Sequence, residues 1–207
     1  MNLPRIQPIN PSRIAAPFDH DDWCFEIKMD GWRCTAYVED GMCELLSRNG
    51  NVYKSFARLT KEIATLPVKN AIIDSEVVCL DGEGKSVFLD LMRRRKAEAL
   101  LYCFDLLWLN GEDLRTLPLL ERKRRLQPPI KGHAGLLYAE HIEAKGMDLF
   151  RAICAKDLEG MVCKHRLAPY VTTPATWFKV INPAYSQKRG RQEMFEGFRA
   201  AEPVPAR

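Results

Sequence analysis

Several common sequence signatures are missing from this 207-residue chain. No apolar run approaches the length of a membrane span, and the start of the chain has no hydrophobic signal core, so we expect a cytoplasmic protein with no membrane partner. The seven cysteines are dispersed without a C-x-x-C pair, and the four histidines have no metal-ligand spacing. These absences exclude disulfide-stapled secreted domains and zinc-finger proteins.

The composition is that of a folded protein with a mild excess of positive charge. Hydrophobic residues make up 46% of the chain, which is enough for a core in one large domain or two small ones. The net charge of +4 points weakly to a polyanionic partner. Two basic clusters, at 93–96 and 122–125, strengthen that indication slightly. We expect each cluster to form the solvent-exposed face of a helix.

Strand patterns joined by short turns alternate with segments of helical spacing. The Asp40-Gly41 turn predicts a hairpin of 33–38 with 43–47, and Ser55 is a candidate N-cap for a helix over 56–66. The other expected strands are 71–80, 101–109, 160–164 and 176–181, and the other expected helices are 88–100, 119–126 and 146–155. The pattern predicts an α+β fold with largely antiparallel sheets flanked by helices.

The most informative stretch is EIKMDGWR, residues 26–33. Apolar residues at the odd positions from 23 to 29 alternate with Glu26, Lys28 and Asp30, which predicts a strand with a buried back and a charged front. A lysine held on a rigid strand can act as an amine nucleophile when its surroundings favour the neutral form. The alternative is an ordinary edge strand with a solvated charged face, because so short a motif also arises by chance.

Further polar insertions interrupt apolar segments in a fixed order along the chain. They are Ser47-Arg48-Asn49-Gly50, Asp74-Ser75-Glu76, Glu159-Gly160-Met161-Val162-Cys163-Lys164 and Trp177-Phe178-Lys179. Each one alone is most simply an exposed polar position. Together with residues 26–33 and with the FDLL segment at 104–107, they are improbable as a set of unrelated exposed residues.

In this order, the motifs resemble those of the adenylation domain of ATP-dependent DNA ligases, especially compact bacterial ligases and the ligase modules of end-joining proteins. The resemblance implies an ATP-grasp-like nucleotidyltransferase domain at 15–197, preceded by an extended lead at 1–14 and followed by a disordered tail at 198–207. It implies ATP and Mg²⁺ as cofactors and nicked double-stranded DNA as a partner.

The resemblance also implies a role for each matching residue. Lys28 would attack the α-phosphorus of ATP, expel pyrophosphate and hold AMP as a phosphoramidate. The AMP would then pass to the 5′-phosphate of a nick. The 3′-hydroxyl of the nick would displace it and form the phosphodiester. Glu26 would read the adenine amino group, and Phe104 would stack on the ring. Lys164 and Lys179 would neutralise charge at the α-phosphate.

The remaining matches concern ribose, phosphate and metal. Arg33 and Arg48 would hold ribose or phosphate through their planar guanidinium groups. Glu76 and Glu159 would contact the ribose or Mg²⁺, because this ion prefers carboxylate and phosphate oxygens.

Two features depart from the family pattern. Ile181 stands where a second lysine usually follows the one that matches Lys179, and 172–175 replaces a Gly-x-Arg-Ser element. We expect no C-terminal OB-fold, which leaves an OB-fold protein or a DNA end-joining protein as a candidate partner.

These departures leave open a degenerate, non-catalytic module that binds a nick or a nucleotide. ATP is the expected donor rather than NAD, since only 27 residues precede Lys28. RNA ligases and mRNA-capping guanylyltransferases share the core motifs, but the motifs at 104–107 and 159–164 are more similar to those of the DNA enzymes.

Overall fold

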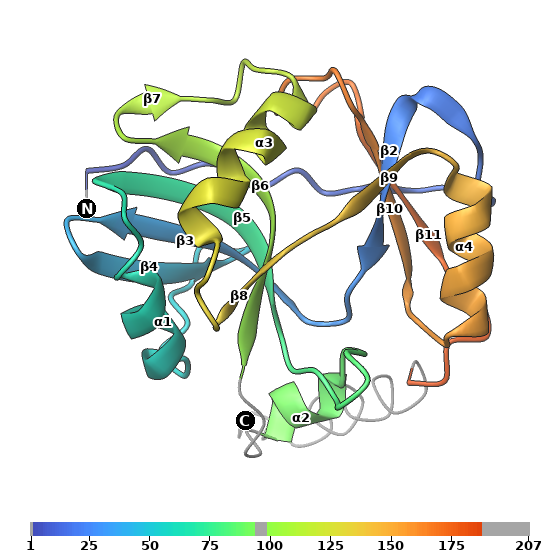
Figure 1. Cartoon of the computed structure of the whole chain (residues 1–207), viewed down its shortest axis with the longest axis horizontal. Helices are drawn as coiled ribbons and strands as arrows, with labels where there is room; N and C mark the ends of the chain where they lie inside the picture. The colour runs from blue at the N-terminus through green and yellow to red at the C-terminus, as the bar shows by residue number, and fades with distance from the viewer. Residues whose placement is uncertain (1, 94–98, 188–207) are drawn as a thin grey trace, which may run out of the picture.

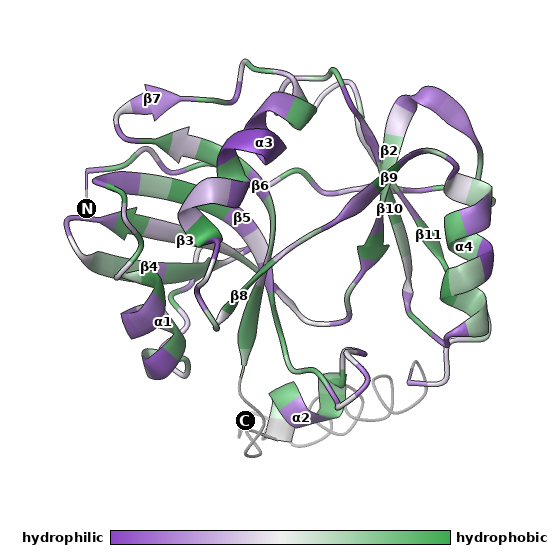
Figure 2. Ribbon diagram, viewed as in Figure 1, coloured by the Kyte–Doolittle hydropathy of each residue, from purple (hydrophilic) through white to green (hydrophobic). Residues whose placement is uncertain are grey.

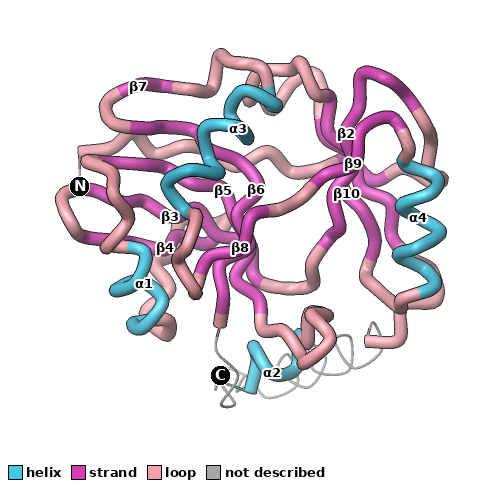
Figure 3. The backbone as a smooth tube through the Cα atoms, viewed as in Figure 1, coloured by secondary structure: helices cyan, strands magenta, loops and turns pink. Residues whose placement is uncertain are grey.

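Two β-sheets form the centre of the computed structural model, and helices pack on their outer faces (Figures 1 and 3). The structure describes residues 2–93 and 99–187. The elements in chain order are β1 (Ser12–Arg13), β2 (His20–Lys28), β3 (Trp32–Glu39), β4 (Met42–Ser47), α1 (Ala57–Ile63), β5 (Asn70–Val78), α2 (Phe88–Arg93), β6 (Leu100–Leu109), β7 (Glu112–Asp113), α3 (Leu119–Ile130), β8 (Leu136–Tyr138), β9 (His141–Ala144), α4 (Gly146–Ala155), β10 (Gly160–His165) and β11 (Trp177–Ile181).

The sheets are mainly antiparallel. The first sheet has five strands in the order β1-β11-β10-β2-β9, and the second has six in the order β4-β3-β5-β6-β7, with β8 also paired to β6. Only the pairs β1 with β11 and β6 with β8 run parallel among the described strands. The predicted α+β class with largely antiparallel sheets is confirmed. No helix in the described ranges is long and apolar enough to cross a membrane.

Elements with strong local signals lie where the sequence predicts them. Strands β3 and β4 form the expected hairpin, and Asp40 and Gly41 at its turn have φ values of 50° and 74°. Positive φ at both central residues is what a type I′ hairpin turn requires, and an Asp-Gly pair tolerates it. Helix α4 has the predicted bounds, and all seven cysteines are free.

Other predictions of local structure are wrong. Phe56, not Ser55, is the N-cap of α1, and no side chain caps that helix. Leu100 begins β6 instead of ending a helix, and α2 is described only to Arg93; 94–98, with most of the first basic cluster, lie outside the described residues. Helix α3 continues past the predicted end to Ile130, whose burial in the core holds the last turn in place.

Three apolar clusters stabilise the layers. One lies between the six-stranded sheet and helices α1 and α3, a second between the two sheets, and a third between the five-stranded sheet and α4. In Figure 2 the strands are mostly hydrophobic, whereas α3 is largely hydrophilic. Both sheets are therefore fixed relative to each other by apolar packing, and polar groups that point between them are held on rigid strands.

The N-terminal segment is extended, and it is built into the same core. Leu3, Ile6 and Ile9 are buried in the cluster between the sheets. The backbone N–H of Ile6 donates to the Tyr37 hydroxyl and that of Ile9 to the Tyr170 hydroxyl, both at 3.0 Å. These contacts fix the path of the chain so that β1 lies at the edge of the five-stranded sheet.

Gly31 joins β2 to β3 at a point that has no room for a side chain. A Cβ atom there would lie 2.3 Å from the Val77 carbonyl oxygen and 2.9 Å from a methyl carbon of Val78. Gly31→Ala must displace β5, and we expect the free energy of unfolding, measured by denaturant titration, to fall by about 1–3 kcal/mol. Gly82→Ala is the matched control, because nothing lies within 4 Å of its Cβ position. Equal stability of the two variants would contradict this prediction.

Candidate active site

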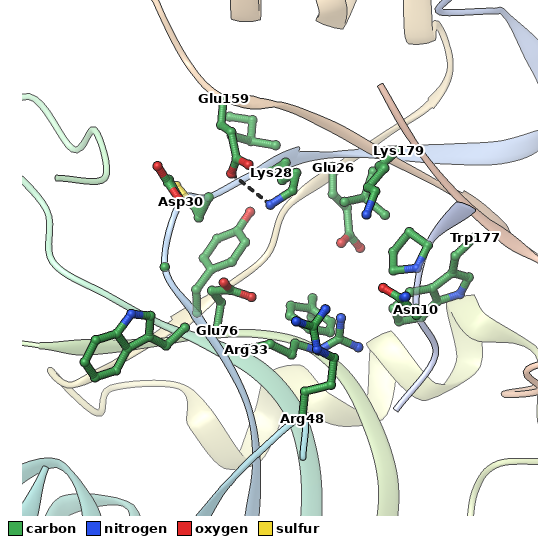
Figure 4. A pocket seen from close by; sticks show the side chains of 18 of the residues that line it. Asn10, Glu26, Lys28, Asp30, Arg33, Arg48, Glu76, Glu159, Trp177 and Lys179 are labelled. Carbon is green, nitrogen blue, oxygen red and sulfur yellow. Dashed lines mark hydrogen bonds and ion pairs between the residues drawn. The ribbon is translucent and has the colours of Figure 1, made fainter. Parts of the chain in front are cut away.

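A pocket of about 1010 Å³ opens between the two sheets. That volume suits a nucleotide-sized ligand. All nine residues assigned by resemblance line it: Glu26, Lys28, Arg33, Arg48, Glu76, Phe104, Glu159, Lys164 and Lys179. Figure 4 shows Glu26, Lys28 and Lys179 facing Arg33, Arg48 and Glu76 across the space. The structure thus brings together residues that are up to 153 positions apart, from Glu26 to Lys179.

Lys28 lies at the end of β2, beside an acid. Its Nζ is 2.8 Å from Oε2 of Glu159, the contact drawn as a dashed line in Figure 4. The antiparallel pairing of β10 with β2 sets Gly160 opposite Lys28, which brings the preceding Glu159 next to the lysine. The Lys28 side chain is 24% exposed and that of Glu159 is 10% exposed. A ligand in the pocket can therefore reach the amine.

Two more carboxylates flank this pair. Burial raises the pKa of Glu76 to about 7, although Lys28 and Arg33 act in the opposite direction, and Glu159 and Asp30 raise it further. Asp30 is buried and accepts a hydrogen bond from the Tyr185 hydroxyl at 3.2 Å. The predicted charged front of β2 is therefore not a solvent-exposed face; it points into the pocket.

Glu76 and Glu159 are the candidate Mg²⁺ ligands. Within residues 2–93 and 99–187, no group of three or more His, Cys, Asp or Glu side chains is arranged to hold a metal ion. Magnesium at nucleotide sites commonly uses one or two carboxylates together with phosphate oxygens and water. Two glutamates that face the pocket from the two sheets therefore fit an ion that enters with a nucleotide.

The second basic cluster is not a solvent-exposed face, so that prediction is wrong for half of its members. Arg122 is 0% exposed and Lys123 is 1% exposed, whereas Arg124 is exposed. Arg122 forms a two-point ion pair with Asp105 on β6, with Nε–Oδ1 and Nη2–Oδ2 both at 2.8 Å. Helical spacing with Leu119 and Leu126 is the sequence signal that could have placed 122 and 123 on the buried side of α3.

Lys123 is buried and contacts Glu26, which lines the pocket. Its Nζ is 2.6 Å from Oε1 of Glu26, and Nζ of Lys164 is 2.6 Å from Oε2. Burial alone would raise the pKa of Glu26, but the two lysines outweigh it and hold that pKa below its usual value. Glu26 is therefore an ionised carboxylate held in a fixed position in the pocket lining, and it can only accept hydrogen bonds. Sequence reasoning did not connect Lys123 with Glu26.

Arg33 and Phe104 form part of the opposite wall. Asp74 binds the Arg33 guanidinium at two points, 2.7 and 2.6 Å. The Arg33 guanidinium lies 4.6 Å from the Phe104 ring centre, and Nζ of Lys164 lies 4.5 Å from it. A base that stacks on Phe104 competes with these cations. The expected roles of Arg33 and Phe104 stay predictions.

Three further cations line the pocket. Arg48 is in the turn after β4, Lys179 is on β11, and Arg13 is on β1. Burial lowers the pKa of Lys179, and the charges of Lys28 and Arg48 lower it further. Arg13 was missed by the sequence analysis, because a parallel pairing between segments so far apart leaves no local pattern.

Comparison with known proteins agrees with this geometry. Residues 7–180 match the family model for the ATP dependent DNA ligase domain. The multifunctional non-homologous end joining protein LigD of Pseudomonas aeruginosa is 33% identical over 183 residues, which covers 84% of this chain and 22% of LigD. The SPbeta prophage-derived DNA ligase-like protein LigB of Bacillus subtilis is 28% identical over 190 residues, which covers 88% of this chain and 69% of LigB.

A solved structure shows the same fold. Mycobacterial DNA ligase D, complexed with ATP and MES, matches with a TM-score of 0.70 and 26% identity, over 83% of this chain and 58% of that one. The chain thus spans only part of these relatives, about a fifth of the P. aeruginosa LigD. Because the family model matches most of its length, the chain belongs to the ATP-dependent DNA ligase domain family, as its motifs predict.

Proposed function

We propose that this chain is a catalytic adenylation domain, in which Lys28 takes AMP from ATP and passes it to the 5′-phosphate of a nick in double-stranded DNA. The position of Lys28 carries the proposal: its amine lies in a nucleotide-sized pocket, 2.8 Å from Glu159 and among further acids and cations. Similarity to LigD, whose name describes an end-joining protein, supports a setting in DNA end joining, with an OB-fold or end-joining protein as partner.

The first step is a substitution at phosphorus. The neutral amine of Lys28 forms a bond to the α-phosphorus and gives up one proton to solvent, while the bond to the bridging oxygen breaks and pyrophosphate leaves with its electron pair. Lys179 and Arg48 line the same pocket and can stabilise the charge that develops on the phosphate oxygens. Mg²⁺, held by Glu76 and Glu159, would supply further charge neutralisation.

In this proposal, Glu26 recognises the adenine base. Its carboxylate is held in place by Lys123 and Lys164, so it is pre-oriented and needs no rearrangement to accept the adenine amino group. A guanine presents a carbonyl oxygen at that position and meets a second acceptor. We therefore infer selectivity for ATP over GTP.

The second stage of the proposal predicts transfer of AMP to DNA. Protein labelled with α-³²P-ATP and Mg²⁺ is freed of nucleotide and mixed with a nicked duplex that bears a 5′-phosphate. We expect the label to leave the protein, appear on the 5′ end of the DNA, and be released as AMP when the nick is sealed. A duplex with a 5′-hydroxyl is the control and should accept no label. Label that stays on folded protein with both duplexes would contradict the transfer step.

A further inference from the structure

Strand β1 brings an additional arginine to the pocket. It pairs in parallel with β11, in a register that sets Arg13 opposite Lys179, and the backbone N–H of Ile14 donates to the Lys179 carbonyl at 3.1 Å. The anchoring of Ile6 and Ile9 to two tyrosine hydroxyls fixes the path of this segment. Arg13 lines the pocket together with its neighbours Asn10 and Pro11, and Figure 4 shows Asn10 at its edge. The position of Arg13 is therefore set by backbone pairing.

The charge around Arg13 is unbalanced. Arg13, Arg48 and Lys179 make no ion pair with a carboxylate among the described residues, whereas Lys28, Arg33 and Lys164 each have one. Arg13 is also close enough to Lys179 to contribute to lowering its pKa. Arg13 and Lys179 lie on the five-stranded sheet and Arg48 follows β4 of the other sheet, so the three cations, which repel one another, face the same part of the pocket from two sides. Such an arrangement is favourable when an anion binds between them.

We infer that Arg13 is a phosphate-binding residue, which extends the group of cations formed by Arg48 and Lys179 to a subsite for a second phosphate group, beside the one attacked by Lys28. The inference rests on the proposed function for the identity of the ligand. The phosphate belongs either to the leaving pyrophosphate of ATP or to the 5′-phosphate of the nick. A guanidinium suits both, because it can donate two parallel hydrogen bonds to a tetrahedral phosphate.

Direct binding tests the subsite without requiring catalysis. Inorganic pyrophosphate is titrated into the full chain by calorimetry, using wild type, Arg13→Ala, Arg13→Lys and the exposed control Arg151→Ala. If the phosphate is that of ATP, Arg13→Ala should weaken pyrophosphate binding about tenfold, Arg13→Lys less, and Arg151→Ala not at all. Arg13 is exposed, so its variants should fold, and thermal unfolding checks this.

A second titration identifies the alternative source of phosphate. Fluorescence anisotropy compares nicked duplexes bearing a 5′-phosphate or a 5′-hydroxyl. If the phosphate is that of DNA, wild type should prefer the 5′-phosphate duplex about tenfold, and Arg13→Ala should lose that preference. Wild-type behaviour of Arg13→Ala in both titrations would overturn the subsite. Loss of binding with Arg13→Ala in a protein that forms no lysine–AMP adduct would uphold the subsite and contradict only the proposed function.

Discussion

Lys28→Ala is expected to abolish the covalent protein–AMP adduct altogether. Lys28 is the only lysine for which the motif order predicts nucleophilic attack, and its amine lies within the pocket beside Glu159. An alanine has no group that can bond to phosphorus, so the loss should be complete. The measurement is incubation with α-³²P-ATP and Mg²⁺, followed by a denaturing gel.

Two further variants separate chemistry from folding. Lys28→Arg keeps a positive charge opposite Glu159 but has no reactive amine, so it should remain folded and unlabelled. Lys156→Ala, an exposed lysine beyond the end of α4, should label like wild type. An adduct that persists in both Lys28 variants would show that another residue is the nucleophile.

Arg122→Leu is expected to cause the largest loss of stability. The arginine and Asp105 are both 0% exposed, and Arg122 also donates to the Leu117 and Ala168 carbonyl oxygens at 2.6 and 3.2 Å. Removing one partner of a buried ion pair leaves the other charge without compensation, which costs about 3–5 kcal/mol. Denaturant unfolding of the purified variant measures this cost.

The neighbouring Arg124 provides the control. Its side chain is 72% exposed and pairs with Glu121 on the same helix. Exposed pairs of this kind contribute about 0–1 kcal/mol, so Arg124→Ala should be close to wild type. If both variants lose the same stability, the burial of Arg122 has no energetic consequence and the prediction fails.

The sequence predicted most of the elements whose signals are local. The Asp40-Gly41 hairpin and the bounds of α4 follow from turn chemistry and periodicity within a few residues. The nine candidate site residues could also be selected from the sequence, because each matches a short motif and the motifs occur in a characteristic order. They meet in one pocket because the strands that carry them pair in the observed order.

Long-range pairings account for what the sequence did not predict. The burial of Lys123 depends on Glu26, 97 positions away, and that of Arg122 depends on Asp105. Arg13 reaches the pocket because β1 pairs with β11, whose sequence lies far downstream. A charged residue on a helix is usually solvated, so its buried partner can be recognised only when the fold is known.

The most direct test of the central claim is the mass of the intact protein after incubation with ATP and Mg²⁺. Pyrophosphate is first used to discharge any AMP already bound, and peptide mapping then locates the modification. The account predicts a gain of one AMP on the peptide that contains Lys28, and loss of that AMP when nicked DNA with a 5′-phosphate is added. A folded protein that binds ATP and gains no mass, or that carries AMP on another residue, would contradict it.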